Sequence, residues 1–146
     1  MSGSVLCAVD ISNGTDDLPT IQRAAKLADL DGVQLDVIAV VPDFGLSPVA
    51  TFFSESHHEE MVNQAKVLLN NLVTQAIGPE ANAKVRHVIS TGRAYEEVIK
   101  TAEVSGASLI VVGAHKADLE DYLLGPNASR IVRHSECSVY VVRPES

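Results

Sequence analysis

Two glycines stand twelve positions apart in the segment VVGAHKADLEDYLLGPNASRIVRH, which begins within the fourth of five apolar runs. Gly113 and Gly125 allow the backbone to approach a ligand closely, because glycine has no Cβ. Lys116 between them could supply a mobile positive charge. Pro126 opens a predicted helix whose first amides and dipole attract anions, although the proline itself has no amide to donate. Asn127 adds a side-chain donor. These residues form a candidate phosphate site, and a plain crossover loop stays open as the simpler alternative.

Asp10 is a second candidate, because it follows directly on the first apolar run, SVLCAV. In an open α/β sheet, ligands bind beyond the carboxyl ends of the strands. A carboxylate there could coordinate magnesium or accept a hydrogen bond from a ribose hydroxyl. Asp10 could instead cap the turn DISNGTD by accepting hydrogen bonds from nearby amides. The sequence leaves both roles open.

The histidines and the known catalytic motifs indicate no additional site. His57 and His58 are adjacent on a predicted helix and face different directions, which disfavours a shared metal ion. Among the five histidines, only His115 falls in the candidate site. The sequence contains no GxSxG elbow and no Walker-type GxxxxGK. No catalytic constellation is therefore predicted.

Five runs rich in β-branched residues predict the strands that must position these groups: 4–10, 34–41, 83–90, 108–114 and 138–143. Stretches with helical apolar spacing separate them, so strands and helices alternate along the chain. This alternation predicts parallel pairing in an α/β fold with right-handed crossovers. The run 83–90 alternates polar and apolar residues, which favours an exposed or edge position.

Glycine and proline mark the expected ends of the helices. Pro19 fits the first turn of the first helix, and Gly32, Gly78 and Gly106 fit the ends of the first three. The segment 42–56 is irregular and too apolar for a solvated loop. We expect it to be a packed flap, an oligomer contact or a lid.

Length, composition and net charge limit the class of protein. A chain of 146 residues predicts one domain, spanning 1–146. A net charge of −8, with 4% aromatic residues and no Trp, disfavours nucleic-acid binding. The start MSGSVLCAVD lacks a basic leader, and no apolar run is long enough for a membrane span, so we expect the cytoplasm. Cys7 and Cys137 lie in or beside apolar runs and are expected to pack as free thiols.

The whole chain resembles the single-domain type of the universal stress protein family. The resemblance rests on CAVDIS, VISTGRAYEEVIKTAE, AHKADLEDYLLGPNAS and ASRIVRHSECSVYVVR. Nucleotide-binding members of the family carry Gly, two residues, Gly, nine residues, Gly, then Ser or Thr. Gly113 and Gly125 match the first and last glycines. Lys116 takes the place of the second glycine, eight residues separate it from Gly125, and Pro126 replaces the hydroxyl residue. These departures make the segment similar to the enterobacterial F/G-type branch, where ATP-type binding is still known.

The resemblance implies a doubly wound, Rossmann-like open sheet of five parallel strands in the order 3-2-1-4-5. It also implies a site for an adenine nucleotide, ATP or else AMP or ADP, together with Mg. By this resemblance Asp10 lies near the ribose or the metal, and the backbone of Val40 contacts the adenine edge. The positions lining the ribose and phosphates are Gly113, His115, Lys116, Gly125 and Asn127.

A homodimer through the terminal strand 138–143 is a further implication, and tetramers remain open. The chain would then act as a stress-responsive switch that an unknown protein partner reads. Two alternatives stay open. In one, Lys116 and Pro126 close the site and leave a non-nucleotide interaction module. In the other, the chain is a slow ATP hydrolase that uses Asp10 or His115 as its base.

Overall fold

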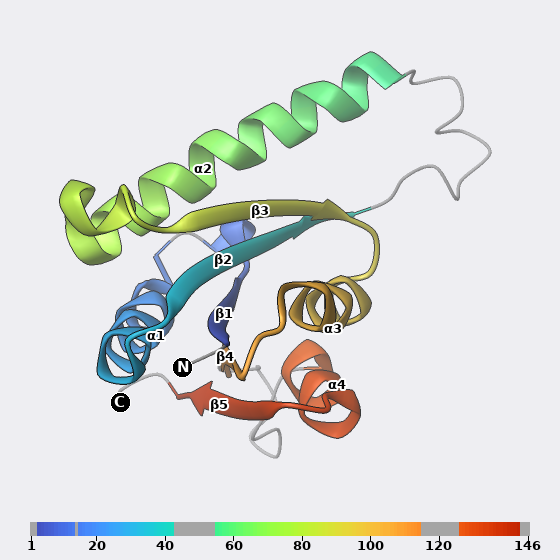
Figure 1. Cartoon of the computed structure of the whole chain (residues 1–146). Coiled ribbons are helices and arrows are strands. Elements are labelled where there is room, and N and C mark those ends of the chain that lie inside the picture. The colour runs from blue at the N-terminus through green and yellow to red at the C-terminus, as the bar shows by residue number, and fades with distance from the viewer. Residues whose placement is uncertain (1–2, 14, 43–54, 115–125, 144–146) are drawn as a thin grey trace.

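A computed structural model describes residues 3–13, 15–42, 55–114 and 126–143 of the chain (Figure 1). Its elements, in chain order, are β1 (Ser4–Val9), η1 (Ile11–Asn13), α1 (Leu18–Asp31), β2 (Gln34–Val41), α2 (Glu55–Asn82), β3 (Arg86–Thr91), α3 (Ala94–Ser105), β4 (Leu109–Gly113), α4 (Pro126–His134) and β5 (Ser138–Val142). The five strands form one sheet in the order β3-β2-β1-β4-β5, and every neighbouring pair is parallel. The α/β class and the order 3-2-1-4-5 are therefore confirmed.

Helices cover both faces of the sheet. Figure 1 shows α1 and α2 on one face, with α3 and α4 on the other. All six residues of β1 are buried, and their side chains alternate between two cores. Val5 and Cys7 belong to the core under α1 and α2, whereas Leu6 and Ala8 belong to the core under α3 and α4. A central strand must be apolar on both faces to bury both, which explains the unbroken run SVLCAV.

Glycines end the helices as the sequence predicts. Gly32 and Gly106 adopt left-handed backbone conformations, with φ of 65° and 69°, directly after α1 and α3. Gly78, with φ of 86° and ψ of 162°, breaks α2. The chain then makes one further turn to Asn82. Pro126 is the first residue of α4. Each of these positions uses the conformational freedom of glycine or the fixed φ of proline.

The short turn after Gly78 folds back onto α2 through buried Asn82. The side-chain amide of Asn82 donates to Asn70 Oδ1 at 2.9 Å and to Thr74 Oγ1 at 2.8 Å. Its oxygen lies 2.7 Å from His87 Nε2 at the start of β3. Because the amide nitrogen is the donor, His87 must donate to the oxygen through a protonated Nε2. Desolvation by partial burial lowers the pKa of His87.

The two edges of the sheet are β3 and β5. The predicted edge position of the run 83–90 is confirmed, since β3 is an edge strand without a fully buried residue. At its first residue Arg86 Nε donates to Asp36 Oδ1 of β2 at 2.9 Å. The side chain of Asp36 is 1% exposed and that of Arg86 is 61% exposed. The exposed guanidinium of Arg86 thus neutralises the buried carboxylate of Asp36.

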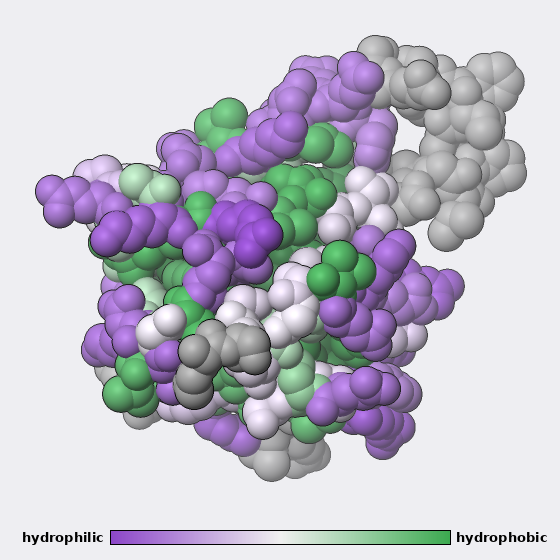
Figure 2. All heavy atoms as spheres, viewed as in Figure 1, coloured by the Kyte–Doolittle hydropathy of each residue, from purple (hydrophilic) through white to green (hydrophobic). Residues whose placement is uncertain are grey.

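Charged and polar residues cover most of the surface in Figure 2, with apolar residues gathered beneath α2. Among the described residues, no helix combines the length and apolar character that crossing a membrane requires. Cys7 and Cys137 are both free thiols, as expected. Burial, and then the negative charge of Asp17, raise the pKa of Cys7 well above its usual value. Of the segment 42–56, residues 43–54 lie outside the described residues.

Candidate functional site

The carboxyl ends of the central strands bring three of the candidate residues together. The register of β1 with β2 places Asp10 level with Val40. The register of β1 with β4 places Gly113 one residue earlier along the neighbouring strand. Because these strands are adjacent and parallel, the three residues lie side by side where the strands end. We call this side, at the carboxyl ends of the strands, the carboxyl edge of the sheet. The edge is the place where open α/β sheets bind ligands.

Asp10 is exposed and stands at the start of a turn that its own side chain organises. Both the backbone amide and the hydroxyl of Ser12 donate to Asp10 Oδ1, the amide at 2.9 Å. The turn-capping role is therefore confirmed. It does not exclude ligand binding, because the carboxylate group remains exposed at the edge of the sheet.

Buried Asp17 fixes the main chain of this turn. The backbone amide of Asp10 donates to Asp17 Oδ2 at 2.7 Å, and Thr20 Oγ1 donates to Asp17 Oδ1 at 3.2 Å. Asp17 is only 1% exposed. Hydrogen bonds to a buried carboxylate are strong and directional, so Asp17 positions Asp10. Asp17 was not among the predicted site residues, although an acidic residue two positions before Pro19 is a typical helix-start signal.

Val40 presents its backbone to β1. The amide of Gly92 donates to Val41 O at 3.0 Å, so the backbone groups of Val41 face β3. Consecutive residues of a strand direct these groups to opposite sides, which turns those of Val40 towards Asp10. The side chain of Val40 is half-buried and packs against the core under α3 and α4. Only the main chain of this residue is thus directed at the site.

The segment 111–134 is described only at its two ends. Gly113 is buried, and the next amide, that of Ala114, donates to Val142 O at 2.8 Å. Asn127 is exposed in the first turn of α4. Since α4 leads back to the start of β5, its first turn points towards the carboxyl edge of the sheet. The other candidates, His115, Lys116 and Gly125, lie outside the described residues.

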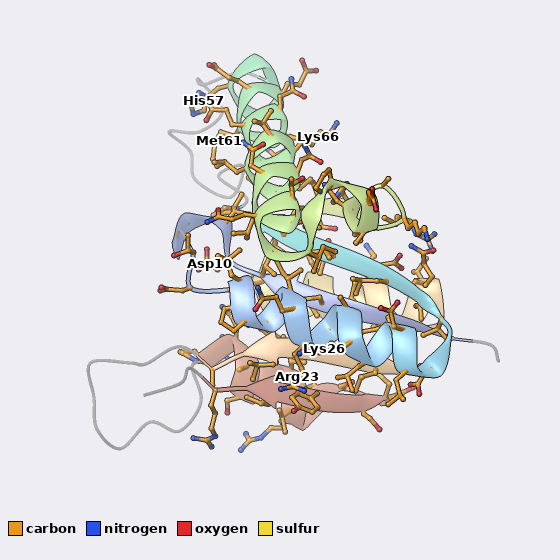
Figure 3. The ribbon with its side chains drawn as sticks, turned by 90° about the vertical axis from the view of Figure 1, so that its left-hand side faces the viewer. Asp10, Arg23, Lys26, His57, Met61 and Lys66 are labelled. Atoms are coloured by element: carbon orange, nitrogen blue, oxygen red, sulfur yellow. The ribbon has the colours of Figure 1, made fainter. Side chains whose placement is uncertain are left out.

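A contact from α2 also reaches this edge. His58 Nε2 lies 3.2 Å from Oγ1 of Thr91, the last residue of β3. His58 was weighed above only as a metal ligand, so this bond was not predicted. Figure 3 shows His57 and Met61 on α2 towards the same side of the view as Asp10, with Lys66 on the opposite side of the helix. The start of α2 therefore stands over the carboxyl edge.

A metal ion at this edge would need ligands beyond the described side chains. Within the described ranges, no three His, Cys, Asp or Glu side chains form a group that could hold a metal ion. Asp10 supplies a single exposed carboxylate. Magnesium is commonly held in this manner, by one or two carboxylates together with phosphate oxygens and water.

Comparisons with known proteins agree over nearly the whole chain. The model of the universal stress protein family matches residues 1–143. Universal stress protein G of Shigella flexneri is 27% identical over 146 residues, which cover 98% of this chain and all of the relative. The structure of the protein MJ0577 of Methanocaldococcus jannaschii superposes with a TM-score of 0.79 at 22% identity, covering 100% of this chain and 99% of that one. The universal stress protein of Archaeoglobus fulgidus in complex with dAMP gives a TM-score of 0.61 at 16% identity, covering 97% and 98%.

Proposed function

The chain belongs to the universal stress protein family, and from this premise we propose that it binds an adenine nucleotide at the carboxyl edge of β1 and β4. The ligand we propose is ATP with Mg, with ADP or AMP as alternatives that the test below distinguishes. The complex of the Archaeoglobus fulgidus relative with dAMP supports the nucleotide class. Binding would serve a stress-responsive switch that a protein partner reads.

One observation carries the proposal: the exposed Asp10 carboxylate, the inward backbone of Val40 and buried Gly113 converge on adjacent strands. A nucleotide needs hydrogen-bonding backbone for the base, an acceptor for the ribose, and close backbone approach for the phosphates. Val40 offers the first of these, Asp10 the second and Gly113 the third. Asp10 would hold either the ribose or, jointly with phosphate oxygens, magnesium.

The phosphate contacts of the proposal come from the family resemblance. Asn127 is exposed in the first turn of α4, where unpaired amides favour an anion. Lys116, His115 and Gly125 are assigned to the ribose and phosphates by their positions in the family pattern alone. A lysine acts as a point charge, so Lys116→Ala should weaken ATP more than AMP.

Two measurements test nucleotide binding. First, denatured purified protein is searched for released adenine nucleotide, which identifies the resident ligand. Second, the melting temperature is measured with Mg-ATP at about 100 times its Kd, where binding adds about 2.7 kcal/mol to the free energy of unfolding. For a chain of this size the expected rise is about 5–10 °C. Asp10→Asn keeps an acceptor for Ser12 and removes only the charge, so it should reduce the magnesium-dependent part of this rise.

A matched control is Asp29→Asn, which removes an exposed carboxylate from α1 near the opposite edge of the sheet. It should leave the rise unchanged. Absence of nucleotide in the extract together with no thermal shift would establish the alternative, a non-nucleotide interaction module. Phosphate release that falls in Asp10→Asn would instead establish the slow ATP hydrolase.

We further propose that the switch is a homodimer paired through β5. The light-scattering measurement described below also distinguishes a dimer from a tetramer. β5 is an edge strand, and an uncovered edge can pair with its two-fold mate. Val142 O accepts a bond from β4, so the neighbouring amide of Val141 points away from the sheet. Val141→Pro would therefore remove an outward donor and leave the β4 ladder intact. Light scattering should show the wild type as a dimer and this variant as a monomer.

A further inference from the structure

A surface cavity of about 240 Å³ lies at the opposite end of the sheet from Asp10. It is enclosed by the last turn of α3 and by the turn that joins α4 to β5. Ile99, Ala102 and Ala107 form its apolar wall. Because β4 and β5 begin beside it, this is the amino edge of the sheet. The cavity is therefore separate from the proposed nucleotide site.

Two acidic residues from different elements line the same cavity. Glu103 belongs to α3 and Glu136 to the turn before β5, and both are exposed. The ion pairs within the described part of the chain are Arg86–Asp36 and Arg93–Glu96, so neither Glu103 nor Glu136 has a basic partner there. The carboxyl end of α3 adds the negative end of a helix dipole. A positive group in the cavity would meet three sources of negative potential, and no described Lys, Arg or His lines the cavity.

Cys137 forms part of the cavity wall and does not act as a nucleophile. Cys137 is half-buried, and its Sγ lies 3.3 Å from Ser135 Oγ. Reactive cysteines sit beside positive groups or helix amino ends. The polar residues that line the cavity with Cys137 are one serine and two glutamates, and the nearby helix end is the carboxyl end. Cys137 therefore adds soft, apolar surface to the wall formed by Ile99 and its neighbours.

We propose that this cavity binds a primary alkylammonium group. The alkyl chain would lie on the apolar wall, and the ammonium would lie between Glu103 and Glu136. A lysine side chain of a protein partner and a free amine share this chemistry, and the titration below distinguishes them. A short aliphatic chain has few atoms and the carboxylates are solvated, so we expect a dissociation constant of about 1–10 mM. Binding should weaken as salt screens the carboxylates.

The test is a two-dimensional amide NMR titration of the full chain with n-butylammonium chloride at constant ionic strength. The amides of Gly106, Ser135 and Cys137 should shift and saturate together. Glu103→Gln and Glu136→Gln should each weaken binding by about threefold, because an exposed ion pair is worth little. Glu59→Gln, which changes an exposed residue of α2 near the carboxyl edge, is the matched control and should bind as the wild type does.

Neutral n-butanol and sodium chloride complete the comparison. Equal shifts with either of them, or unaltered binding in the Glu103→Gln Glu136→Gln double variant, would overturn the proposal. Tighter binding of a peptide carrying one lysine assigns the site to a protein partner, whereas tighter binding of the diamine cadaverine assigns it to a free amine. The cavity lies at the opposite end of the sheet from Asp10, so the outcome of the titration is independent of the nucleotide site.

Discussion

Replacement of Asp17 by alanine tests whether the turn after β1 is held by one buried carboxylate. The variant loses the acceptor of two hydrogen bonds, one from the amide of Asp10 at 2.7 Å and one from Thr20 Oγ1 at 3.2 Å. Hydrogen bonds to charged groups contribute about 1.5–3 kcal/mol each, and the longer bond from Thr20 belongs at or below the lower end. The expected loss in the free energy of unfolding is about 3 kcal/mol.

Two further variants divide this loss between the bonds. Thr20→Val removes only the hydroxyl and should cost about 1 kcal/mol. Asp17→Asn keeps one oxygen, but its amide nitrogen cannot accept from the Asp10 amide, so it should cost about 2 kcal/mol. Asp16→Ala is the matched control, because Asp16 is the exposed neighbour of Asp17 and should change stability by less than about 0.5 kcal/mol.

Urea denaturation measures all four variants. With an m-value of about 2 kcal/mol per molar, Asp17→Ala should lower the midpoint by about 1.5 M at unchanged m. A midpoint within about 0.3 M of the Asp16→Ala value would refute the reasoning. The same bond positions Asp10, so nucleotide affinity in native buffer should fall in Asp17→Ala, and this second readout rests on the proposed function.

Three other predictions concern stability elsewhere in the fold. Arg86→Ala should cost about 1–3 kcal/mol in urea denaturation, because it strands the buried carboxylate of Asp36 while its own charge is largely solvated, and adding Asp36→Asn should recover part of that loss. Because partial burial lowers the pKa of His87, the unfolded chain binds more protons than the folded chain does below about pH 6.5. The free energy of unfolding should therefore fall as pH drops through this range and level off below the lowered pKa. His87→Gln, which can still donate to Asn82, should flatten that fall; an unchanged pH profile would contradict the assignment. Gly78→Ala should cost about 1–3 kcal/mol, measured as a lower urea midpoint, since a Cβ there meets no atom within 4 Å but the backbone has φ of 86° and ψ of 162°.

The strands and the ends of the helices could be read from local pattern. Each observed strand lies within three residues of its predicted bounds. Gly32 and Gly106 were recognisable as helix ends because only a left-handed residue closes a helix in this manner. The alternation in 83–90 predicted an edge strand because one face of such a strand must be solvated.

The site was predictable only in part. Asp10 follows an apolar strand, which is a local signal, and its position beside Val40 follows once the strand order is known. Asp16 and Asp17 are chemically identical neighbours, and the helix-start signal at Asp17 does not say which of the two is buried. The bond from His58 to Thr91 joins residues 33 positions apart. Such contacts depend on the path of the chain between elements.

The sequence by itself determined the alternation of strands and helices, the apolar central strand and the presence of Asp10 at its end, because these follow from side-chain periodicity and glycine placement. Tertiary structure alone decided that Asp17 would hold Asp10, and that Glu103 and Glu136 would line one cavity. Periodicity fixes the direction of a side chain within its own element. The potential at any point in space is summed over elements that only folding brings together.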